Sequence, residues 1–398
     1  MTASGIRRIS AAQRRARLAV RHRLAPPARA STAEDVARDL VALHGTDPAS
    51  VYLAVWTRTA GVDAAMISHT LYQERALIRM LGMRRTMFVV PAGSAPVIQA
   101  ACTDEIAQRL RRLLVKRLQE AGIADDAAGW LTEAGDATVQ ALTVRGAATG
   151  AELSRDVPRL RTQIVVAEGK SYGGLVSIAT QVLMLLSAEG RIVRGRPLGG
   201  WTSSQYQWQL PGTWRPGRPE DAYPSPGAAR TELARRWLLT FGPAPVSDLQ
   251  WWTGWTAGQA KAALAGLSIT EADLDGVPGI LLAGDDAPGP GSEPWAALLP
   301  ALDPTAMGWR ERGWFLGEHK NVLFDRSGNI GPTVWWDGRI VGGWAQRETG
   351  EVVFRLLEDA GADAREAIAA EAERLGEWLA GTRVTPRFRT PLERELSG

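Results

Sequence analysis

His44 is one of four histidines in a chain of 398 residues, and it lies two residues before a hydroxyl and three before a carboxylate. It belongs to the stretch VALHGTDPASVYLAVW, in which Gly45, Thr46 and Asp47 follow it directly. The unperturbed pKa of histidine is about 6.5, so an imidazole can exchange a proton near neutral pH. The position also suits a structural residue at a helix end, because Asp47-Pro48 breaks the chain before a new helix. The residues alone leave both interpretations of His44 open.

The motifs of P-loop proteins and of HExxH metalloenzymes are missing from the sequence. Gly169-Lys170-Ser171 looks like the end of a phosphate-binding P-loop, but Ile164 stands where that motif requires a glycine. Cys102 is the single cysteine, which excludes an internal disulfide bond. One cysteine and four scattered histidines do not form a structural zinc site. We therefore expect neither a metal nor another cofactor.

Two groups of arginines lie on two predicted hairpins. They are Arg84 and Arg85 in the first group, and Arg191, Arg194 and Arg196 in the second. Successive basic groups can neutralise several phosphates, which makes nucleic-acid binding fall steeply as the salt concentration rises. Tyr206 and Trp208 follow the second group, and an aromatic ring beside a basic loop can stack on an exposed base. The alternative is that both rings belong to the core of the second hairpin.

The elements that would carry these residues occur three times along the chain. In the first copy, Thr32 begins a helix, a second helix covers 51–57, and a strand at 78–81 pairs through Gly82 with one at 83–90. The second copy has helices at 139–144, 149–157 and 177–189 and two short strands within 191–208. The third copy has a helix capped by Ser247, a helix at 257–267 and a strand at 280–283. Helices followed by a hairpin are typical of a winged helix, so three tandem winged-helix units are predicted.

The pattern changes after a linker rich in glycine and proline at residues 284–294. Short strands are predicted at 321–325, 333–337, 339–346 and 351–357, followed by a helix at 362–380. The strands form an antiparallel meander or a small barrel, and Trp335, Trp336 and Trp344 are expected to fill its core. The fold class is therefore α+β, with three winged-helix units and a C-terminal β-barrel carrying a helix. The expected domain boundaries are 1–122, 123–215, 216–290 and 291–398.

Composition limits the class of protein. Hydrophobic residues make up 45% of the chain and charged residues 22%, which is typical of a globular protein. The net charge is only +3, but the first 33 residues contain eight arginines and no acidic residue, which creates a local positive field. No apolar run approaches the roughly 20 residues that a membrane span needs. We therefore expect a cytoplasmic protein without a membrane partner.

Several stretches of the chain resemble one protein family. They are LVALHGTDPASVYLAVWTR, KSYGGLVSIATQVLMLLSAEGRIVRGRPLGGWTSSQYQW, GPAPVSDLQWWTGW and LPALDPTAMGW. These stretches resemble the AlkZ/YcaQ-like winged-helix proteins, which include bacterial DNA glycosylases that remove N7-alkylated purines and unhook interstrand crosslinks. The resemblance covers most of the chain and agrees with three winged-helix units followed by a barrel. It implies a monomer that clasps double-stranded DNA in a concave channel, nucleoid-associated when bound.

The catalytic signature of that family is a Gln-x-Gln or Gln-x-Asp triplet, and the matching residues here are His44-Gly45-Thr46. The resemblance implies that this triplet holds the attacking water and supports positive charge on the sugar. His44 would orient the water or take its proton, and Thr46 would only form hydrogen bonds, because a hydroxyl is neither a base nor an anion at pH 7. Asp47 would stabilise an oxocarbenium-like centre, unless it serves as a helix N-cap.

The chemical demand on such an enzyme is small. An N7-alkylated purine is already positively charged and leaves as a neutral base, so positioning water and stabilising the sugar cation would supply much of the rate. No lysine lies near the triplet in sequence, which favours a monofunctional enzyme over a Schiff-base lyase, with Lys170 left open. The alternative is a winged-helix DNA-binding protein without catalysis, such as a transcriptional regulator. Asp303 in LPALDPTAMGW is interpreted as a turn or cap residue because Asp-Pro favours turns.

Overall fold

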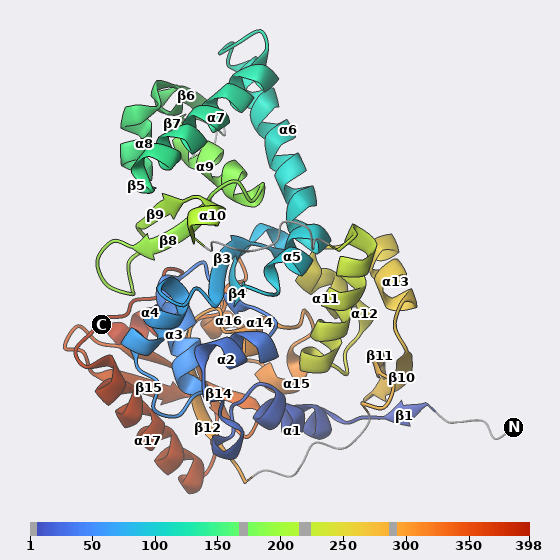
Figure 1. Cartoon of the computed structure of the whole chain (residues 1–398). Coiled ribbons are helices and arrows are strands. Elements are labelled where there is room, and N and C mark those ends of the chain that lie inside the picture. Colours follow the sequence, from blue (N-terminus) through green and yellow to red (C-terminus); the bar gives the residue numbers. More distant parts are fainter. Residues whose placement is uncertain (1–5, 167–173, 215–223, 286–292) are drawn as a thin grey trace, which may run out of the picture.

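The computed structural model describes residues 6–166, 174–214, 224–285 and 293–398, and Figure 1 shows the arrangement of its elements. A first unit (residues 33–91) combines three helices with a three-stranded antiparallel sheet. Its elements are α2 (Ala33–Asp39), β2 (Leu43–His44), α3 (Pro48–Thr57), α4 (Ala64–Tyr72), β3 (Leu77–Leu81) and β4 (Met87–Pro91). The strand order is β2-β4-β3, so the strand predicted at 78–81 pairs with the one after it as expected. The second strand is shorter than the predicted 83–90, because Met83–Arg85 forms a 3-10 turn.

Local sequence explains where the helices of this unit begin. Thr32 caps α2 by accepting a hydrogen bond from the Asp35 backbone N–H at 3.1 Å, and Asp63 caps α4 in the same way. Proline follows the cap of α3, at the position where its missing N–H costs nothing. All ten residues of α3 are buried, so this helix lies inside the molecule rather than on its surface.

A second unit (residues 127–209) stands apart from the rest of the molecule at the end of the long helix α6 (Asp104–Glu120), as Figure 1 shows. Between the first unit and α6 lie α5 (Ala95–Ile98) and a π-helical turn (Gln99–Thr103). The second unit consists of α7 (Ala127–Arg145), β5 (Ala147–Thr149), α8 (Gly150–Asp156), α9 (Ala179–Ala188), β8 (Val193–Pro197) and β9 (Tyr206–Gln209). Its strand order is β5-β9-β8, and an extra hairpin, β6 (Gln163–Val166) with β7 (Gly174–Ser177), is inserted between α8 and α9.

A third unit (residues 226–282) follows the short helix α10 (Pro211–Trp214). It contains α11 (Pro226–Phe241), α12 (Val246–Thr253), α13 (Ala257–Ala265), β10 (Ile269–Leu274) and β11 (Val277–Leu282). An isolated bridge between Ala244 and Ile280 takes the place of the first strand, and the N-terminal β1 (Arg7–Arg8) adds to the free edge of β10 in parallel. The predicted cap Ser247 was wrong, because α12 begins one residue earlier, after Pro245. The three units therefore share one connection order: helix, strand or bridge, two helices and a hairpin.

The C-terminal part of the chain corrects the prediction of a barrel. Its strands are β12 (Ala296–Leu299), β13 (Thr333–Trp336), β14 (Arg339–Gln346) and β15 (Val352–Leu356), in that order. Within the described residues the sheet stays open, because helices cover both faces: α17 (Ala362–Leu379) on one and α18 (Pro391–Ser397) with α15 (Gly313–Leu316) on the other. Trp335 and Trp344 are buried as predicted, whereas Trp336 is half-buried. The predicted strand at 321–325 is instead the short helix α16 (Lys320–Leu323).

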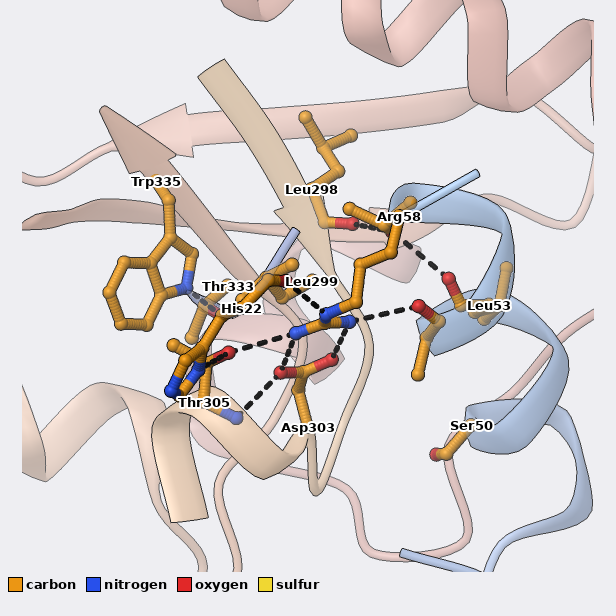
Figure 2. A network of polar contacts seen from close by, with 12 residues as sticks. His22, Ser50, Leu53, Arg58, Leu298, Leu299, Asp303, Thr305, Thr333 and Trp335 are labelled. Carbon is orange, nitrogen blue, oxygen red and sulfur yellow. Dashed lines mark hydrogen bonds and ion pairs between the residues drawn. The ribbon is translucent and has the colours of Figure 1, made fainter. Parts of the chain in front are cut away.

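A buried ion pair connects the first unit to this C-terminal region (Figure 2). Arg58, directly after α3, and Asp303, before α14 (Pro304–Met307), are both 0% exposed and meet through two contacts of 2.6 and 2.8 Å. The remaining guanidinium N–H groups donate to the His22 carbonyl at 2.9 Å, the Ala54 carbonyl at 2.9 Å and the Thr305 hydroxyl at 2.8 Å. All five donors of the guanidinium are therefore satisfied. Asp303 also caps α14, as its Asp-Pro sequence predicts.

His22 extends this network from the end of α1 (Ala11–Arg21) to the third unit. Its Nε2 lies 3.2 Å from the Thr240 carbonyl oxygen, which can only accept, so Nε2 carries the proton. Nδ1 then accepts from the Thr305 hydroxyl at 2.8 Å. Burial, with a further contribution from the charge of Arg58, lowers the pKa of His22 to about 3. The imidazole is consequently neutral, and the network binds the first unit, the third unit and the C-terminal region together.

We predict that Asp303→Ala destabilises the protein by about 3–5 kcal/mol, because it leaves the buried Arg58 charge without its partner. The matched control is Arg8→Ala, which removes an exposed ion pair with Asp275 and should change stability little. Chemical unfolding followed by tryptophan fluorescence measures both variants. Similar losses in the two variants would show that the buried pair has no special part in holding the regions together.

Candidate active site

The triplet His44-Gly45-Thr46 forms the passage from β2 to α3. The Gly45 N–H donates to the Met87 carbonyl at 2.8 Å, so this turn stays attached to β4. A side chain at Gly45 would meet the backbone carbon of Phe88 at 3.2 Å, which explains why a glycine is needed there. Thr46 is half-buried beside the buried His44. The backbone of the triplet is therefore fixed by the sheet rather than free to move as a surface loop.

Asp47 follows the triplet and caps α3. One carboxylate oxygen accepts from the Ala49 N–H at 3.1 Å, and the other accepts from the Arg387 N–H at 3.0 Å. Burial raises the pKa of Asp47, and these two backbone hydrogen bonds oppose that rise. Both oxygens already have partners, so this carboxylate joins the start of α3 to the C-terminal segment.

His44 differs from an ordinary histidine in its environment. The residue is 8% exposed, and its ring lies 5.5 Å from that of Phe88. Burial, together with the nearby charge of Arg84, lowers the pKa of His44 to about 3. Its Nδ1 is buried and has no hydrogen-bond partner among the described residues. At pH 7 the ring is therefore neutral and weakly basic, a group suited to orienting a water molecule rather than to removing its proton.

Arg79 is the main site residue that sequence reasoning missed. It lies on β3, is 5% exposed, and donates through Nη1 to the Gly45 carbonyl at 2.6 Å. This bond fixes the peptide group between Gly45 and Thr46. A signal for it exists in the sequence, because Arg79 interrupts the apolar strand LIRML. A buried charge in such a strand needs a specific partner.

The first group of arginines separates into a buried and an exposed member. Arg84 and Arg85 both have positive φ, at 53° and 60°. The Arg84 guanidinium lies 3.8 Å from the centre of the Trp251 ring, whose environment also includes Arg312 at 4.9 Å. Burial lowers the pKa of Arg84 to about 10. Arg84 therefore packs between the third unit and His44, while Arg85 is exposed to solvent.

The second group of arginines lies on the hairpin of β8 and β9 and divides between two neighbours. Arg191, just before β8, pairs with Asp136 of α7 at 2.7 Å, inside the second unit. Arg196 is exposed, and its Nη2 lies 2.6 Å from the side-chain amide group of Gln73, at the end of α4. The hairpin of the second unit thus reaches the first unit, where β8 also contacts β3.

Tyr206 and Trp208 on β9 complete the cluster around Arg79. The Tyr206 ring lies 4.8 Å from the Arg79 guanidinium and 5.7 Å from that of Arg194. Trp208 is buried in the core of the second unit, with Arg194 5.2 Å from its ring. The structure thus brings Tyr206 and Arg194 to the triplet through Arg79. Trp208 instead matches the expectation of a core residue.

The loop between β8 and β9 anchors this contact with a third aromatic side chain. Trp201 lies 5.0 Å from the Tyr52 ring of α3 and 5.6 Å from the Trp378 ring of α17. The second unit is therefore attached to the body of the protein through α6, through the contacts of α9 and β8 with β3, and through the loop that carries Trp201. The triplet lies in the body, directly before the helix α3 that carries Tyr52.

The described residues contain no group of three or more histidine, cysteine, aspartate or glutamate side chains arranged to hold a metal ion. In the same residues, no helix combines the length and apolarity required to cross a bilayer. Lys170 lies outside the described residues.

Comparison with known proteins identifies the class to which this fold and site belong. The family model for DNA glycosylase AlkZ-like proteins matches residues 37–378, and the chain belongs to this family. Among solved structures, it is similar to Streptomyces sahachiroi DNA glycosylase AlkZ, with a TM-score of 0.71 and 20% sequence identity over 93% of this chain and 97% of that one. No curated protein sequence matches. The resemblance seen in the sequence is therefore confirmed at the level of the family.

Burial of a neutral His44 predicts that acid weakens the folded state. The unfolded chain binds a proton at this residue below its usual pKa of about 6.5, whereas the folded chain does so only near pH 3. The contribution of His44 to stability is therefore complete above pH 6.5 and is lost progressively as the pH falls towards 3. Thermal unfolding at pH 7.5 and 5.0 should show a larger loss of Tm for the wild type than for His44→Gln. Equal losses would indicate that His44 titrates normally in the folded protein.

Proposed function

We propose that the protein is a monofunctional DNA glycosylase that hydrolyses the N-glycosidic bond of N7-alkylated or bulky-adduct purines in duplex DNA. The observation that carries this proposal is the buried Nδ1 of His44, a ring nitrogen without a hydrogen-bond partner among the described residues, at the position where the resemblance places the family's catalytic triplet. Membership of the DNA glycosylase family supports the reaction class. The named activity of the Streptomyces protein, a DNA glycosylase, agrees with it.

The chemistry proposed for the triplet is positioning rather than proton transfer. As the C1′–N9 bond of the damaged nucleotide breaks, its electron pair neutralises the cationic purine, so the leaving base needs no acid. Neutral His44 accepts a hydrogen bond from the attacking water at Nδ1, and the Thr46 hydroxyl provides a second contact. Asp47 contributes negative charge near the developing sugar cation, although both of its oxygens already accept backbone hydrogen bonds.

We infer that the three units are winged helices that together hold double-stranded DNA. Their shared connection order and sheet order support this assignment. The boundaries proposed for the four domains are 1–122, 123–215, 216–290 and 291–398. Exposed Arg85 and Arg196 are the proposed phosphate contacts on the surface, and Arg191 is a further candidate. Three such units in one chain allow a monomer to surround DNA, whereas most winged-helix regulators act as dimers.

The test is release of free base from a duplex oligonucleotide that carries one N7-methylguanine. His44→Ala should bind this duplex as the wild type does, and base release should fall by about 100-fold, at the lower end of the range for a positioned catalytic group. The matched control is His69→Ala, because His69 is an exposed histidine on α4 with a side chain 58% accessible. Base release that is the same in wild type and His44→Ala would remove His44 from the mechanism. Tight binding without release from either N7-methylguanine or a bulkier adduct would favour a DNA-binding protein without catalysis.

A further inference from the structure

Several hydrogen-bond donors beside the triplet are buried without a partner. They are Nε and Nη2 of Arg79, Nε of Arg194 and the hydroxyl of Tyr206, none of which meets an acceptor in good hydrogen-bond geometry within the described residues. The Tyr72 hydroxyl is a further polar neighbour of Arg79 and interacts with its guanidinium. The three side chains are close together, because the centre of the Tyr206 ring lies 4.8 Å from the Arg79 guanidinium and 5.7 Å from that of Arg194. Burying charged donors without an acceptor costs free energy that an apolar replacement would avoid. A cluster of this kind is suited to a ligand that supplies acceptor oxygens.

The charge of the cluster specifies that ligand further. The cluster contains three positive charges close enough to affect one another's neighbours: those of Arg79, Arg194 and Arg387. The acidic group among them is Asp47. The oxygens of Asp47 are already held by backbone N–H groups, and Arg79 has no ion pair among the described residues. The local charge is therefore positive by about two elementary charges in the absence of a ligand, taking each side chain in its ordinary ionised form. A group with one negative charge and two available oxygens complements it.

We propose that Arg79, Arg194 and Tyr206 bind one phosphodiester of the DNA strand that carries the damaged nucleotide, and that Arg79 is a positioning residue for the triplet. The proposal rests on the glycosylase function above. Arg79 presents Nε and Nη2 to the two non-bridging oxygens, a geometry that favours paired hydrogen bonds. Its Nη1 keeps the Gly45 carbonyl at 2.6 Å, so the same guanidinium connects the bound phosphate to the turn between His44 and Thr46.

A bound phosphate also changes the electrostatic environment of the triplet. A sugar cation forming near the triplet would be opposed by the positive charges of Arg79 and Arg194. A phosphate bound between them offsets these charges at the moment when the cation develops. Because Tyr206 lies over Arg79 in the DNA-free protein, the phosphate enters only when the β8–β9 hairpin shifts. The site is therefore completed by its own substrate.

The experiment is a scan of neutral methylphosphonate linkages along a duplex that contains a tetrahydrofuran abasic-site analogue, with dissociation constants measured for wild type and Arg79→Gln. The wild type should bind about tenfold more weakly when the contacted linkage is neutral, as expected for a charged hydrogen bond. Arg79→Gln should show the same loss on unmodified DNA and no further loss at that linkage. Its slope of log K against log salt should be smaller by about 0.9, the value for one phosphate contact.

Arg15→Gln is the matched control, because Nη1 of Arg15 also donates to a backbone carbonyl, that of Trp314 at 2.7 Å, away from the triplet. It should lose binding at the contacted linkage as the wild type does. If Arg79→Gln fails to fold, Tyr206→Phe tests the same linkage through the missing hydroxyl. If each neutral linkage near the abasic site weakens binding by Arg79→Gln as much as it weakens binding by the wild type, the proposal is overturned. Arg79 would then have a structural role alone. The scan measures binding and needs no turnover. If Arg79→Gln and the neutral linkage affect the same contact but no base is released, the glycosylase activity is refuted and the phosphate site is not.

Discussion

The ion pair of Arg58 with Asp303 is the contact on which the position of the triplet depends. It holds the C-terminal end of α3, while Asp47 holds the opposite end of this helix against the C-terminal segment. Through His22 the same network reaches the third unit, so three regions far apart in the sequence meet around one fully buried helix. Removing one member would leave a buried charge without its partner, which makes the arrangement cooperative rather than adjustable. A precisely placed triplet requires support of this kind.

Burial also determines what the triplet can do. In water, His44 would be half protonated near pH 6.5 and could act as a base, but in this structure its pKa is about 3 and it stays neutral. Under the proposed function, a neutral His44 keeps the uncharged character of the glutamine that the resemblance implies for this position, which an imidazolium would not. The substitution is thus conservative in charge, although the shape of the side chain differs.

The sequence supports much of the local structure and less of the site. Turn residues and alternating patterns predict the first hairpin and β14 at 339–346 correctly. The short apolar run at 321–325 fits a strand or a helix equally well, and the structure makes it α16. The open C-terminal sheet was taken for a barrel because strand patterns do not reveal that α17 and α18 cover its faces. The low pKa of His44 arises from tertiary burial, which no local pattern records. For Arg79 the sequence shows only a charge inside an apolar strand, and its contact with the Gly45 carbonyl depends on the tertiary fold.

The second unit supplies the remaining constraint on the site, since its hairpin lies over Arg79 while its loop is fixed by Trp201 between α3 and α17. Aromatic contacts of this kind stabilise a position without making it permanent, because each contributes only about 0.5–1.5 kcal/mol beyond the area it buries. DNA binding releases counterions and gains several charged contacts, so it supplies enough free energy to move the hairpin. In the proposed phosphate site, the donors of Arg79 and Arg194 would therefore favour the charged backbone of DNA over a neutral ligand.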